Sequence, residues 1–478
     1  MKNIQAKIAI ASLILMSSIS NLWAQESTTT YFMKGMPQSN FMNPALHNDS
    51  SKLVIGIPGM SGAYYDFNAG FAVDDLMHKG TGMLADSLVL DPVKFRGALS
   101  STNTVQQHFS LPILYVGFRN KNSFFSFGVA EKAMALFSFD KGIVDFLIEG
   151  NADYMGKTQD LGNLNLDAFQ YREYSFGYSH QLLNNKLTIG LKAKMLYGKF
   201  ALQTEQMHLT VETAADGSYL NLNSAMKINL SAPLNVEYDS EGYFFGMKSD
   251  DSSTKDYLME SNNKGLAIDL GAVYKLTPKL TFSASVIDLG KITFENKTVN
   301  LSHVSSKKWE GVDFSNSIDK GSDEYVKPSD LFESEINKVK DSFRPAKSEF
   351  SSEAFEVTIP TKIYLGGTYD LNKQFNFGIL DRVFMYDGYR QNTLTLSANA
   401  MFLNFLSLTG SYSFVGNTSN NLGLGLGIRA GFLQIYAVSD NVIAFHDPSK
   451  AEFANTRVGV SFLFGRKKAL KAKEESVQ

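Results

Sequence analysis

A two-residue alternation of apolar and polar side chains runs through residues 361–464 and constrains the fold more than any other feature. Successive side chains of a β-strand point to opposite faces, so each segment has one apolar face and one polar or glycine face. The pattern therefore predicts a series of strands. Its apolar positions include Ile363, Leu365, Phe377, Ile379, Leu394, Leu396, Leu406, Leu408, Leu422, Leu424, Leu426, Val458, Val460 and Phe462.

A soluble β-sandwich can produce the same alternation, but three features favour a membrane barrel. The segments are about ten residues or longer, the length of a tilted strand that crosses a bilayer. Tight turns alternate with longer loops, as in outer-membrane proteins. Aromatic residues at strand ends (Tyr364, Tyr369, Phe402 and Tyr412) suit the headgroup level of a membrane. We predict an all-β fold, a transmembrane antiparallel barrel of about 14 strands (range about 12–16) with short helical insertions.

The N-terminus has the pattern of a secretory signal. Lys2 and Lys7 precede an apolar run at 8–19, and the small residue Ala24 follows it. A membrane helix is the alternative, but the apolar run is short, and no later run approaches the ~18 apolar residues that a helical span needs. An exported chain of alternating strands is expected in the outer membrane, because a closed barrel satisfies its backbone polar groups in lipid.

Four regions are expected along the chain. Pro44 and the small residues around it argue against a regular element before the first strand. A long polar insertion at about 295–353 is expected on the extracellular side. The predicted regions are a signal peptide (1–24), an N-terminal hatch or plug (25–50), the barrel (51–465) and a periplasmic tail (466–478).

The composition excludes several kinds of function. The chain has no cysteine, which rules out disulfides, thiol chemistry, cysteine-bound metal and a lipoprotein anchor. A net charge of −3 gives no reason to expect nucleic acid. The seven histidines lack metal-ligand spacing, and the acidic runs at 249–251 and 318–324 are more simply solvated loops than cation sites. We predict no metal, no cofactor and no enzymatic activity.

An Asp-Leu-Gly motif occurs twice, beginning at Asp269 and at Asp288, on either side of a turn at Pro278. Strict alternation places Asp269 on the polar face and Asp288 on the apolar face. A β-bulge between Val286 and Asp288 would turn the second carboxylate inward. Two carboxylates in the lumen can bind a cation, or one can stay protonated. The simpler interpretation is that each pairs with a lysine or arginine of the lumen.

Other charged residues are also expected in the lumen. Lys192 and Lys194 lie well inside a strand, and a charge on the lipid side costs several kcal/mol near the bilayer midplane. Arg429 and Arg457 lie on the polar faces of their strands. The glycines of 425–430 match a dinucleotide-binding fingerprint in outline. No helix follows them, so room for neighbouring lumen side chains explains them better.

Two motifs resemble those of known families. Residues 41–45, Phe-Met-Asn-Pro-Ala, resemble a stretch near the mature start of barrels in the long-chain fatty-acid transporter superfamily, and of type IX secretion barrels of the PorV and PorP/SprF kinds. The strands at 265–274 and 280–290 are similar to the signature of an uncharacterised Bacteroidota family of that superfamily, a domain of unknown function. The resemblance implies a roughly 14-stranded barrel with an internal hatch that includes Asn43, Pro44 and Ala45.

Two functions follow as expectations. The first is a channel or transporter that carries hydrophobic or amphipathic small molecules across the outer membrane. The alternative is a non-transporting partner or anchoring barrel of a type IX-like secretion system, whose partner is a secreted protein. An outer-membrane enzyme is a third idea, but no residue set supports it. An apolar pocket near the outer rim favours the transporter, whereas a lumen occluded by polar side chains favours the partner barrel. In each case outer-membrane lipid surrounds the barrel.

Overall fold

The computed structural model describes residues 28–465 except 48–50, 83–84, 86, 251–252, 319–324 and 417. The expected signal peptide and the expected tail at 466–478 lie outside the described residues, as does most of the acidic run at 318–324.

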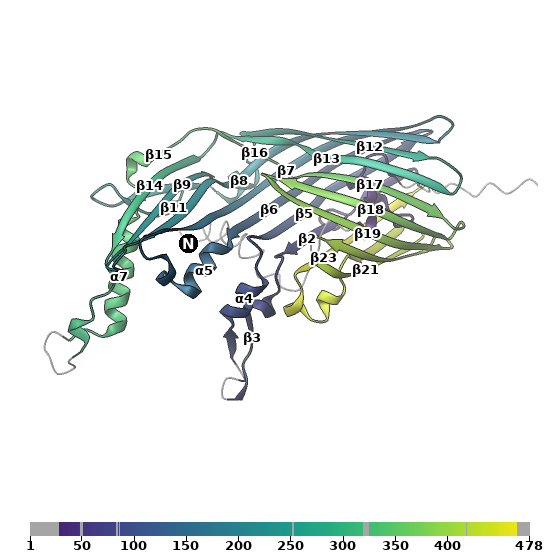
Figure 1. Cartoon of the computed structure of the whole chain (residues 1–478). Coiled ribbons are helices and arrows are strands. Elements are labelled where there is room, and N and C mark those ends of the chain that lie inside the picture. The colour runs from purple at the N-terminus through teal and green to yellow at the C-terminus, as the bar shows by residue number, and fades with distance from the viewer. Residues whose placement is uncertain are drawn as a thin grey trace, which may run out of the picture.

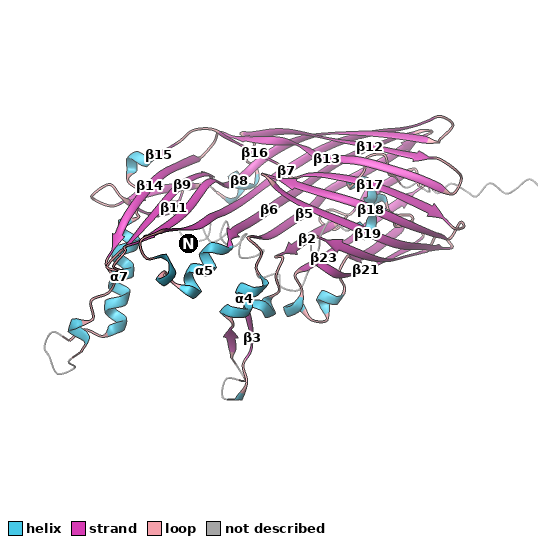
Figure 2. Cartoon of the chain, viewed as in Figure 1, coloured by secondary structure: helices cyan, strands magenta, loops and turns pink. Residues whose placement is uncertain are grey.

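A closed antiparallel β-barrel makes up most of the molecule (Figures 1 and 2). In the described part of the chain its wall has 14 strands, each paired with the next, which confirms the predicted fold class. In wall order they are β1 (Leu53–Gly56) with β2 (Ala63–Asn68), β5 (Thr102–Asn120), β6 (Ser123–Asp140), β7 (Thr158–Leu182), β8 (Leu187–Thr213), β12 (Asn263–Lys275), β13 (Leu280–Phe294), β16 (Phe355–Thr358) with β17 (Thr361–Asp370), β18 (Phe375–Tyr386), β19 (Tyr389–Phe402), β20 (Leu406–Val415), β21 (Thr418–Ala430), β22 (Leu433–Ser439) and β23 (Phe453–Phe464).

Two of the wall strands are interrupted. β1 and β2 both pair with β5 and with β23, so they share one place in the wall, and the pairing of Leu53 with Phe464 closes the barrel. β16 and β17 both pair with β13 and are separated by Ile359 and Pro360. Pro360 has no N–H to donate to a neighbouring strand, which explains the break. Closure leaves no open sheet edge toward lipid.

The two ends of the barrel differ in their connections. Tight turns such as 121–122, 276–279 and 403–405 gather at one end, together with Leu53 and Phe464. Most of the long connections gather at the other. We call these the turn end and the loop end. In known outer-membrane barrels the short turns face the periplasm.

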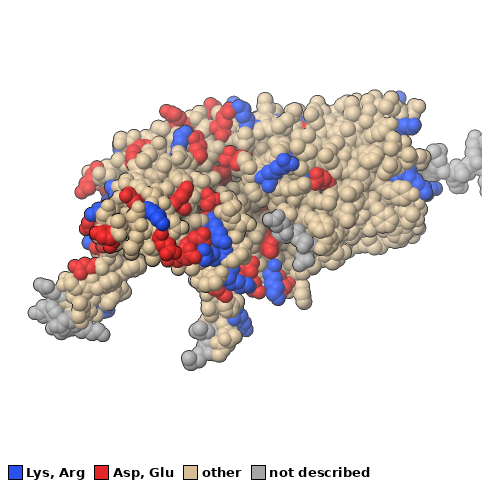
Figure 3. All heavy atoms as spheres, in the orientation of Figure 1, with Lys and Arg blue, Asp and Glu red and all other residues tan. Residues whose placement is uncertain are grey.

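The outer surface of the turn half is apolar. Leu365, Phe377 and Leu424 point outward and are 54%, 52% and 52% exposed. On the face seen in Figure 3 this half is almost free of charge, whereas acidic and basic side chains gather over the loop end. This apolar surface is the lipid belt, the part that a bilayer would cover, and it confirms that the alternating apolar residues form the outer face.

One of the aromatic predictions is wrong. Tyr364 is fully buried inside the barrel and stacks on Tyr31, with ring centroids 5.5 Å apart, so it does not lie at the headgroup level. Its neighbours Ile363 and Leu365 occupy the outward positions, which leaves Tyr364 on the inner face. Tyr369, by contrast, faces outward and is 45% exposed.

A sheet projects beyond the loop end as an extension of β7 and β8 (Figure 1, left). The strand at 220–231 pairs with the extension of β8 and belongs to this projection and not to the barrel. The 295–353 insertion, expected to be a loop, also contributes a strand. We call residues 220–260 and 298–351 the outer arm. Its elements are β9 (Leu220–Ser231), β10 (Leu234–Tyr238), β11 (Phe244–Ser249), α6 (Thr254–Leu258), β14 (Thr298–Trp309), η4 (Ser315–Ser317), α7 (Pro328–Ser342), η5 (Lys347–Glu349) and β15 (Phe350–Ser351).

Short elements fill the remaining loops. One of the expected short helical insertions is α5 (Lys141–Glu149). Another is α4 (Pro92–Ala98), in the long connection that follows the end of β2 at Asn68. No described helix is long and apolar enough to cross a membrane. The other loop elements are α3 (Val73–Leu76), β3 (Met77–Lys79), β4 (Leu88–Leu90), η3 (Ala152–Tyr154), η6 (Ile443–Phe445) and η7 (Pro448–Lys450).

Candidate functional site in the barrel lumen

Residues 28–47, which we call the luminal segment, lie inside the barrel toward the turn end (Figure 1, purple). The segment contains α2 (Thr28–Tyr31) and η1 (Pro37–Phe41). Every residue of α2 is buried, and Asn43 is completely enclosed. The segment forms no strand, so side chains and backbone hydrogen bonds attach it to the wall without sheet pairing.

A buried carboxylate anchors the beginning of this segment. Asp440, which directly follows β22, accepts hydrogen bonds from the backbone N–H groups of Thr28 (2.8 Å) and Thr29 (2.9 Å). The hydroxyl of Thr29 lies 2.6 Å from that of Ser411 in β20. Two backbone donors that begin a helix are therefore satisfied by an ionisable side chain of the wall.

The Asn-Pro-Ala residues press against glycines of the wall. A Cβ atom at Gly190 would lie 2.5 Å from the carbonyl carbon of Pro44. A Cβ atom at Gly271 would lie 2.1 Å from Asn43 Oδ1. Ala45 N also donates to Asn43 Oδ1 at 2.9 Å, which holds the turn. Only glycine leaves room for this backbone against β8 and β12.

Polar contacts hold the same turn against β13. Asn43 Nδ2 donates to the carbonyl oxygen of Ala284 at 3.3 Å. Ser285 Oγ donates to the carbonyl oxygen of Met42 at 2.7 Å. These bonds satisfy polar groups that would otherwise be buried without partners.

Other inward-facing glycines also meet the luminal segment. Glycine in 425–430 leaves room for luminal side chains, as predicted, and the strand continues without a nucleotide-binding turn. The pairs in contact are Gly366 and Gly378 with Phe32, Gly423 with Thr29, Gly425 with Met33, and Gly427 with Met33 and Met36.

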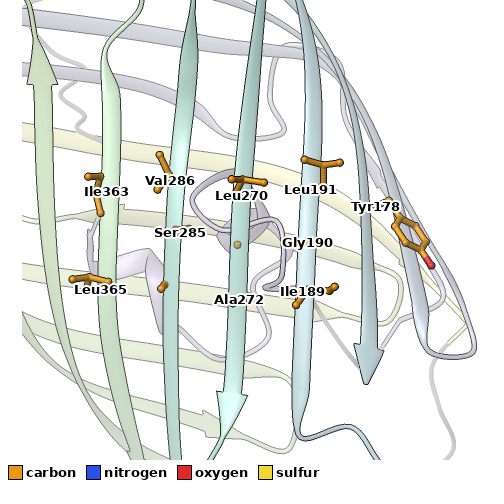
Figure 4. Close-up of a pocket in the computed structure, with 12 residues that line it drawn as sticks. Tyr178, Ile189, Gly190, Leu191, Leu270, Ala272, Ser285, Val286, Ile363 and Leu365 are labelled. Atoms are coloured by element: carbon orange, nitrogen blue, oxygen red, sulfur yellow. The ribbon is translucent and has the colours of Figure 1, made fainter. Parts of the chain in front are cut away.

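An apolar groove of about 610 Å³ lies on the outer face of the same wall patch (Figure 4). Its sides are branched aliphatic residues such as Leu191, Leu270 and Ile363, and the small side chains of Ala272 and Ala284 deepen it. The luminal segment lies directly behind these strands in Figure 4. Where the wall residue is glycine, only strand backbone separates the groove from the luminal segment.

A layer of buried charges crosses the lumen on the loop-end side of the Asn-Pro-Ala turn. Lys192 connects it to the luminal segment, because its Nζ donates to the carbonyl oxygen of Asn40 at 3.0 Å. We call the set the charged layer: Lys132, Glu173, Lys192, Lys194, Asp269, Asp288 and Lys362.

Lys194 is the centre of this layer. Its Nζ lies 2.6 Å from Asp269 Oδ1 and 2.5 Å from Asp288 Oδ1. Lys132 Nζ lies 2.6 Å from Glu173 Oε2, and Lys362 Nζ lies 3.1 Å from Asp288 Oδ2. Each carboxylate has an ammonium partner, which is the simpler of the two interpretations of the repeated Asp-Leu-Gly motif.

The β-bulge predicted before Asp288 is present. Ile268 pairs with Leu289 but Leu270 pairs with Val286, so β13 has an extra residue at this point. Asp288 adopts φ of 61° and is 1% exposed, and its N–H donates to Asp269 Oδ1 at 2.8 Å. The bulge turns the carboxylate into the lumen. No cluster of three or more potential metal ligands occurs among the described residues.

The two arginine candidates lie apart from the charged layer. Arg457 is buried, and its guanidinium lies 5.8 Å from the ring of Phe41 and 5.1 Å from that of Tyr64, within cation–π range. Arg429 is half-buried at the turn end, where its Nη2 donates to Ser51 Oγ at 3.2 Å. The structure thus brings four of the six predicted lumen residues together.

An apolar cluster lies in the loop-end part of the lumen, next to buried polar residues such as His108, whose ring centroid is 5.1 Å from that of Phe384. Ring centroids of Phe169 in β7 and Tyr386 in β18 are 5.8 Å apart, although four wall strands separate β7 from β18. Tyr257 of α6 donates to Oε1 of Gln170, the neighbour of Phe169 in β7, at 2.7 Å. We call this set the apolar luminal cluster: Met134, Leu136, Phe169, Tyr171, Leu196, Ala201, Ala267, Ile292, Phe294, Phe355, Val357, Ile359, Phe384 and Tyr386, with Tyr389 packed against it.

Several of these residues were not anticipated from the sequence. Lys132 and Glu173 lie inside long alternating strands, where a charge needs a partner, and this signal could have identified them. Asp440 lies in a loop, and nothing local marks its contact with Thr28. The apolar luminal cluster sits on inner faces that alternation alone predicts to be polar.

The fold and its occupied lumen define an outer-membrane-type β-barrel with an internal N-terminal segment. Residues 44–440 match a family described as "Family of unknown function (DUF5723)", and the chain belongs to this family. No curated protein matches the chain.

Solved structures of similar architecture are transport barrels. The toluene transporter TbuX of Ralstonia pickettii is 10% identical, with a TM-score of 0.39, over 93% of this chain and 100% of that one. A FadL homologue of Pseudomonas aeruginosa is 12% identical, with a TM-score of 0.36, over 93% and 100%. The toluene transporter TodX of P. putida is 10% identical, with a TM-score of 0.34, over 91% and 94%. Such low identities and scores do not carry a function across.

Proposed function

We propose that this protein is a gated outer-membrane transporter for hydrophobic or amphipathic small molecules, with the luminal segment, including Asn43, Pro44 and Ala45, as its hatch. The observation that carries the proposal is the apolar luminal cluster at the loop end. Water-filled barrels have polar interiors. An interior of Phe, Tyr, Ile and Leu instead favours contact with an apolar solute.

The attachment of the luminal segment supports its role as a hatch. It contributes no strand to the wall, so it can shift without breaking any wall pairing. Its contacts are a limited set of hydrogen bonds, to Asp440, Ala284, Ser285 and Lys192 among others, together with close packing on glycines. Such contacts can open locally at a free energy well below that of unfolding the barrel.

The groove on the lipid side supports a hydrophobic cargo. It lies at the height of the Asn-Pro-Ala turn and is lined almost entirely by apolar groups. An apolar molecule can lie there against the wall with little loss of dispersion contacts. The groove and the apolar luminal cluster thus provide apolar surfaces on both sides of the wall.

Uptake into liposomes tests this function. Vesicles that contain the protein should take up a labelled long-chain fatty acid faster than protein-free vesicles. Phe169→Gln should slow this uptake about tenfold, since it places an amide in the apolar luminal cluster, where an unpaired polar group costs ~1–3 kcal/mol. Phe245→Gln is the matched control, because Phe245 is 73% exposed on the outer arm. Equal uptake by vesicles with and without protein contradicts the proposal.

A second candidate is the non-transporting partner barrel of a type IX-like secretion system. Two observations favour it: the luminal segment, the charged layer and the apolar luminal cluster occupy much of the described lumen, and the outer arm projects beyond the barrel. If the protein is such a partner barrel, neither Phe169→Gln nor Phe245→Gln should change the uptake of fatty acid. Deletion of β10 and β11 from the arm should instead release a bound secreted protein from detergent-solubilised barrels.

Export completes the proposal. We propose that residues 1–24 are removed as a signal peptide. We also propose that 466–478 lie in the periplasm, because β23 ends with Phe464 at the turn end, and the short turns of outer-membrane barrels face the periplasm. N-terminal sequencing of protein from outer membranes should begin at Gln25. A protein that retains Met1 contradicts this assignment.

A further inference from the structure

Arg457 of β23 is a buried cation that no carboxylate of the described chain neutralises. The residue is 2% exposed, and neither its Nε nor its Nη1 has a hydrogen-bond partner among the described residues. Asp66 lies on the neighbouring strand β2, but it pairs with His108 at 2.9 Å. A buried charge is costly unless it is paired and hydrogen-bonded. The guanidinium therefore has N–H donors available for an anion.

Two aromatic rings cover this guanidinium. It lies 5.1 Å from the ring of Tyr64 and 5.8 Å from that of Phe41. Tyr64 belongs to the wall, where it pairs with Arg457 across β2 and β23, whereas Phe41 is the last residue of η1 in the luminal segment. A ring face attracts a cation, but charge-assisted hydrogen bonds to an oxyanion are stronger. Phe41 is thus a cover on Arg457 that would leave with the luminal segment.

A second donor without a partner lies beside this cover. Tyr436 of β22 is 2% exposed, and its hydroxyl has no hydrogen-bond partner among the residues that the structure describes. A Cβ atom at Gly62 would lie 3.0 Å from this hydroxyl and 3.2 Å from Cε2 of Phe41, so the hydroxyl and the ring edge meet at the glycine. Tyr436 is also a diagonal neighbour of Arg457, because Val438 pairs with Arg457. A phenol O–H and a guanidinium can both donate to one oxyanion.

Lys192 is the other cation near Phe41, but it already has partners. Its Nζ lies 5.9 Å from the centroid of the Phe41 ring. The same atom donates to the carbonyl oxygen of Asn40 at 3.0 Å and lies 4.0 Å from Asp269. Of the two cations that face this ring, Arg457 is therefore the one whose charge is left for a ligand.

We propose that Arg457 and Tyr436 bind the oxyanionic headgroup of an amphipathic cargo when Phe41 moves away. Tyr64 and Val438 remain with the wall and offer apolar surface to the chain next to the headgroup. Because the headgroup binds only after Phe41 has left, it favours the displaced position of the luminal segment. The inference rests on the proposed function, for which it names an anionic headgroup as the feature that releases the hatch.

Trypsin cleavage after Lys34 in phosphatidylcholine nanodiscs measures this release with three probes. They are decane-1-sulfonate, which stays ionised, decan-1-ol, which lacks the charge, and methanesulfonate, which lacks the chain. Decane-1-sulfonate should raise the cleavage rate about tenfold, the effect expected for hydrogen bonds to a charged group. Decan-1-ol and methanesulfonate should leave the rate unchanged.

Three variants locate the effect. Arg457→Gln should abolish the response to decane-1-sulfonate, and Arg457→Lys, which keeps the charge, should retain part of it. Tyr436→Phe removes one neutral donor and should weaken the response about threefold. Arg390→Gln is the matched control, because Arg390 is an exposed arginine of β19, and it should respond like the unaltered protein. A shift in gel mobility on heating shows which variants form a barrel.

Three outcomes overturn the proposal: no acceleration by decane-1-sulfonate, equal acceleration by decan-1-ol or methanesulfonate, and a full response in folded Arg457→Gln. If Arg457→Gln does not fold, a full response in folded Tyr436→Phe and Arg457→Lys contradicts it instead. Cleavage requires no passage through the barrel, so the two proposals can fail separately. Transport without this response sinks only the headgroup site, and the response without transport sinks only the transporter.

Discussion

The carboxylate of Asp440 accepts a hydrogen bond from the backbone N–H of Thr28 at 2.8 Å, and so joins residues separated by 412 positions in the chain. It also accepts the N–H of Thr29, which fixes the start of the luminal segment to the loop after β22. The other end of the segment continues into β1. Asp440 thus holds the start of the segment non-covalently, in addition to the hydrogen bonds from Ser285 and Lys192 further along it.

Asp440→Asn should loosen this attachment of the segment. Hydrogen bonds to a charged acceptor contribute ~1.5–3 kcal/mol, so their weakening should raise the released population about tenfold. Trypsin cleavage after Lys34 measures that population, because Lys34 lies within the segment and its side chain is 17% exposed. Asp447→Asn, at an exposed aspartate of the same loop, is the control. If both variants are cut at the unaltered rate, Asp440 does not hold the segment.

Gly271→Ala should displace the Asn-Pro-Ala turn, because the new Cβ would lie 2.1 Å from Asn43 Oδ1 and 2.9 Å from Pro44 Cδ. Overpacking of this kind costs ~1–3 kcal/mol. We expect faster cleavage after Lys34 while the heat-modified gel mobility of the barrel is retained. Gly410→Ala has open space around it and should behave like the unaltered protein. Equal rates of cleavage after Lys34 in the two variants would show that the position of the Asn-Pro-Ala turn does not depend on Gly271.

Lys194→Met should destabilise the barrel strongly. It leaves Asp269 without its closest cation and weakens the pairing of Asp288, and removal of one partner from a buried ion pair costs ~3–5 kcal/mol. The midpoint of unfolding in guanidinium measures the loss. Asp269→Asn combined with Lys194→Met should recover part of it. A single variant as stable as the unaltered barrel would contradict the role of the charged layer.

Asp269→Asn with Asp288→Asn separates a structural role of these carboxylates from a transport role. Because each is paired with lysine, we expect lower barrel stability and no change in the selectivity of uptake. A change in uptake without loss of stability would instead favour a functional carboxylate pair.

The stability of the outer arm should depend on pH through the carboxyl group of Glu349. Burial raises the pKa of this carboxyl, but hydrogen bonds from His303 and from the N–H of Ala346 lower the pKa by more, so it lies below its ordinary value. A lowered pKa contributes stability above the ordinary value of 4.5, which is lost as the pH falls through the folded-state pKa. Amide hydrogen exchange of 344–351, corrected for intrinsic rates, should rise below about pH 4.5. Glu349→Gln should remove this pH dependence.

The wall could be predicted from the sequence because its signal is local. Alternation at Leu422, Leu424 and Leu426 determines which side of β21 meets lipid. In β13 the same alternation shows that the carboxylate of Asp288 can face the lumen only if the strand has a bulge. The inner face is less predictable. Tyr364 and Phe169 point inward as apolar residues, because they pack on the luminal segment and on Tyr386, and those contacts join distant parts of the chain.

The outer arm and the contact of Asp440 with Thr28 were also harder to predict, because they too lack a local sequence signal. β14 carries Lys307 and Lys308 and lacks a continuous apolar face, since the strand lies outside the lipid belt. The contact of Asp440 with Thr28 depends on closure of the whole barrel. The Asn-Pro-Ala residues were identified by resemblance, but their glycine partners could be found only in the structure.

The central claim is that the luminal segment must move for a molecule to pass. Thr29 Oγ1 and Ser411 Oγ are 2.6 Å apart, so cysteines at both positions should form a disulfide between the segment and β20. The chain has no other cysteine. We predict that Thr29→Cys/Ser411→Cys in liposomes takes up labelled fatty acid only when reduced, and that each single variant transports under both conditions. Equal uptake by the oxidised and reduced forms of a fully cross-linked double variant would contradict the account.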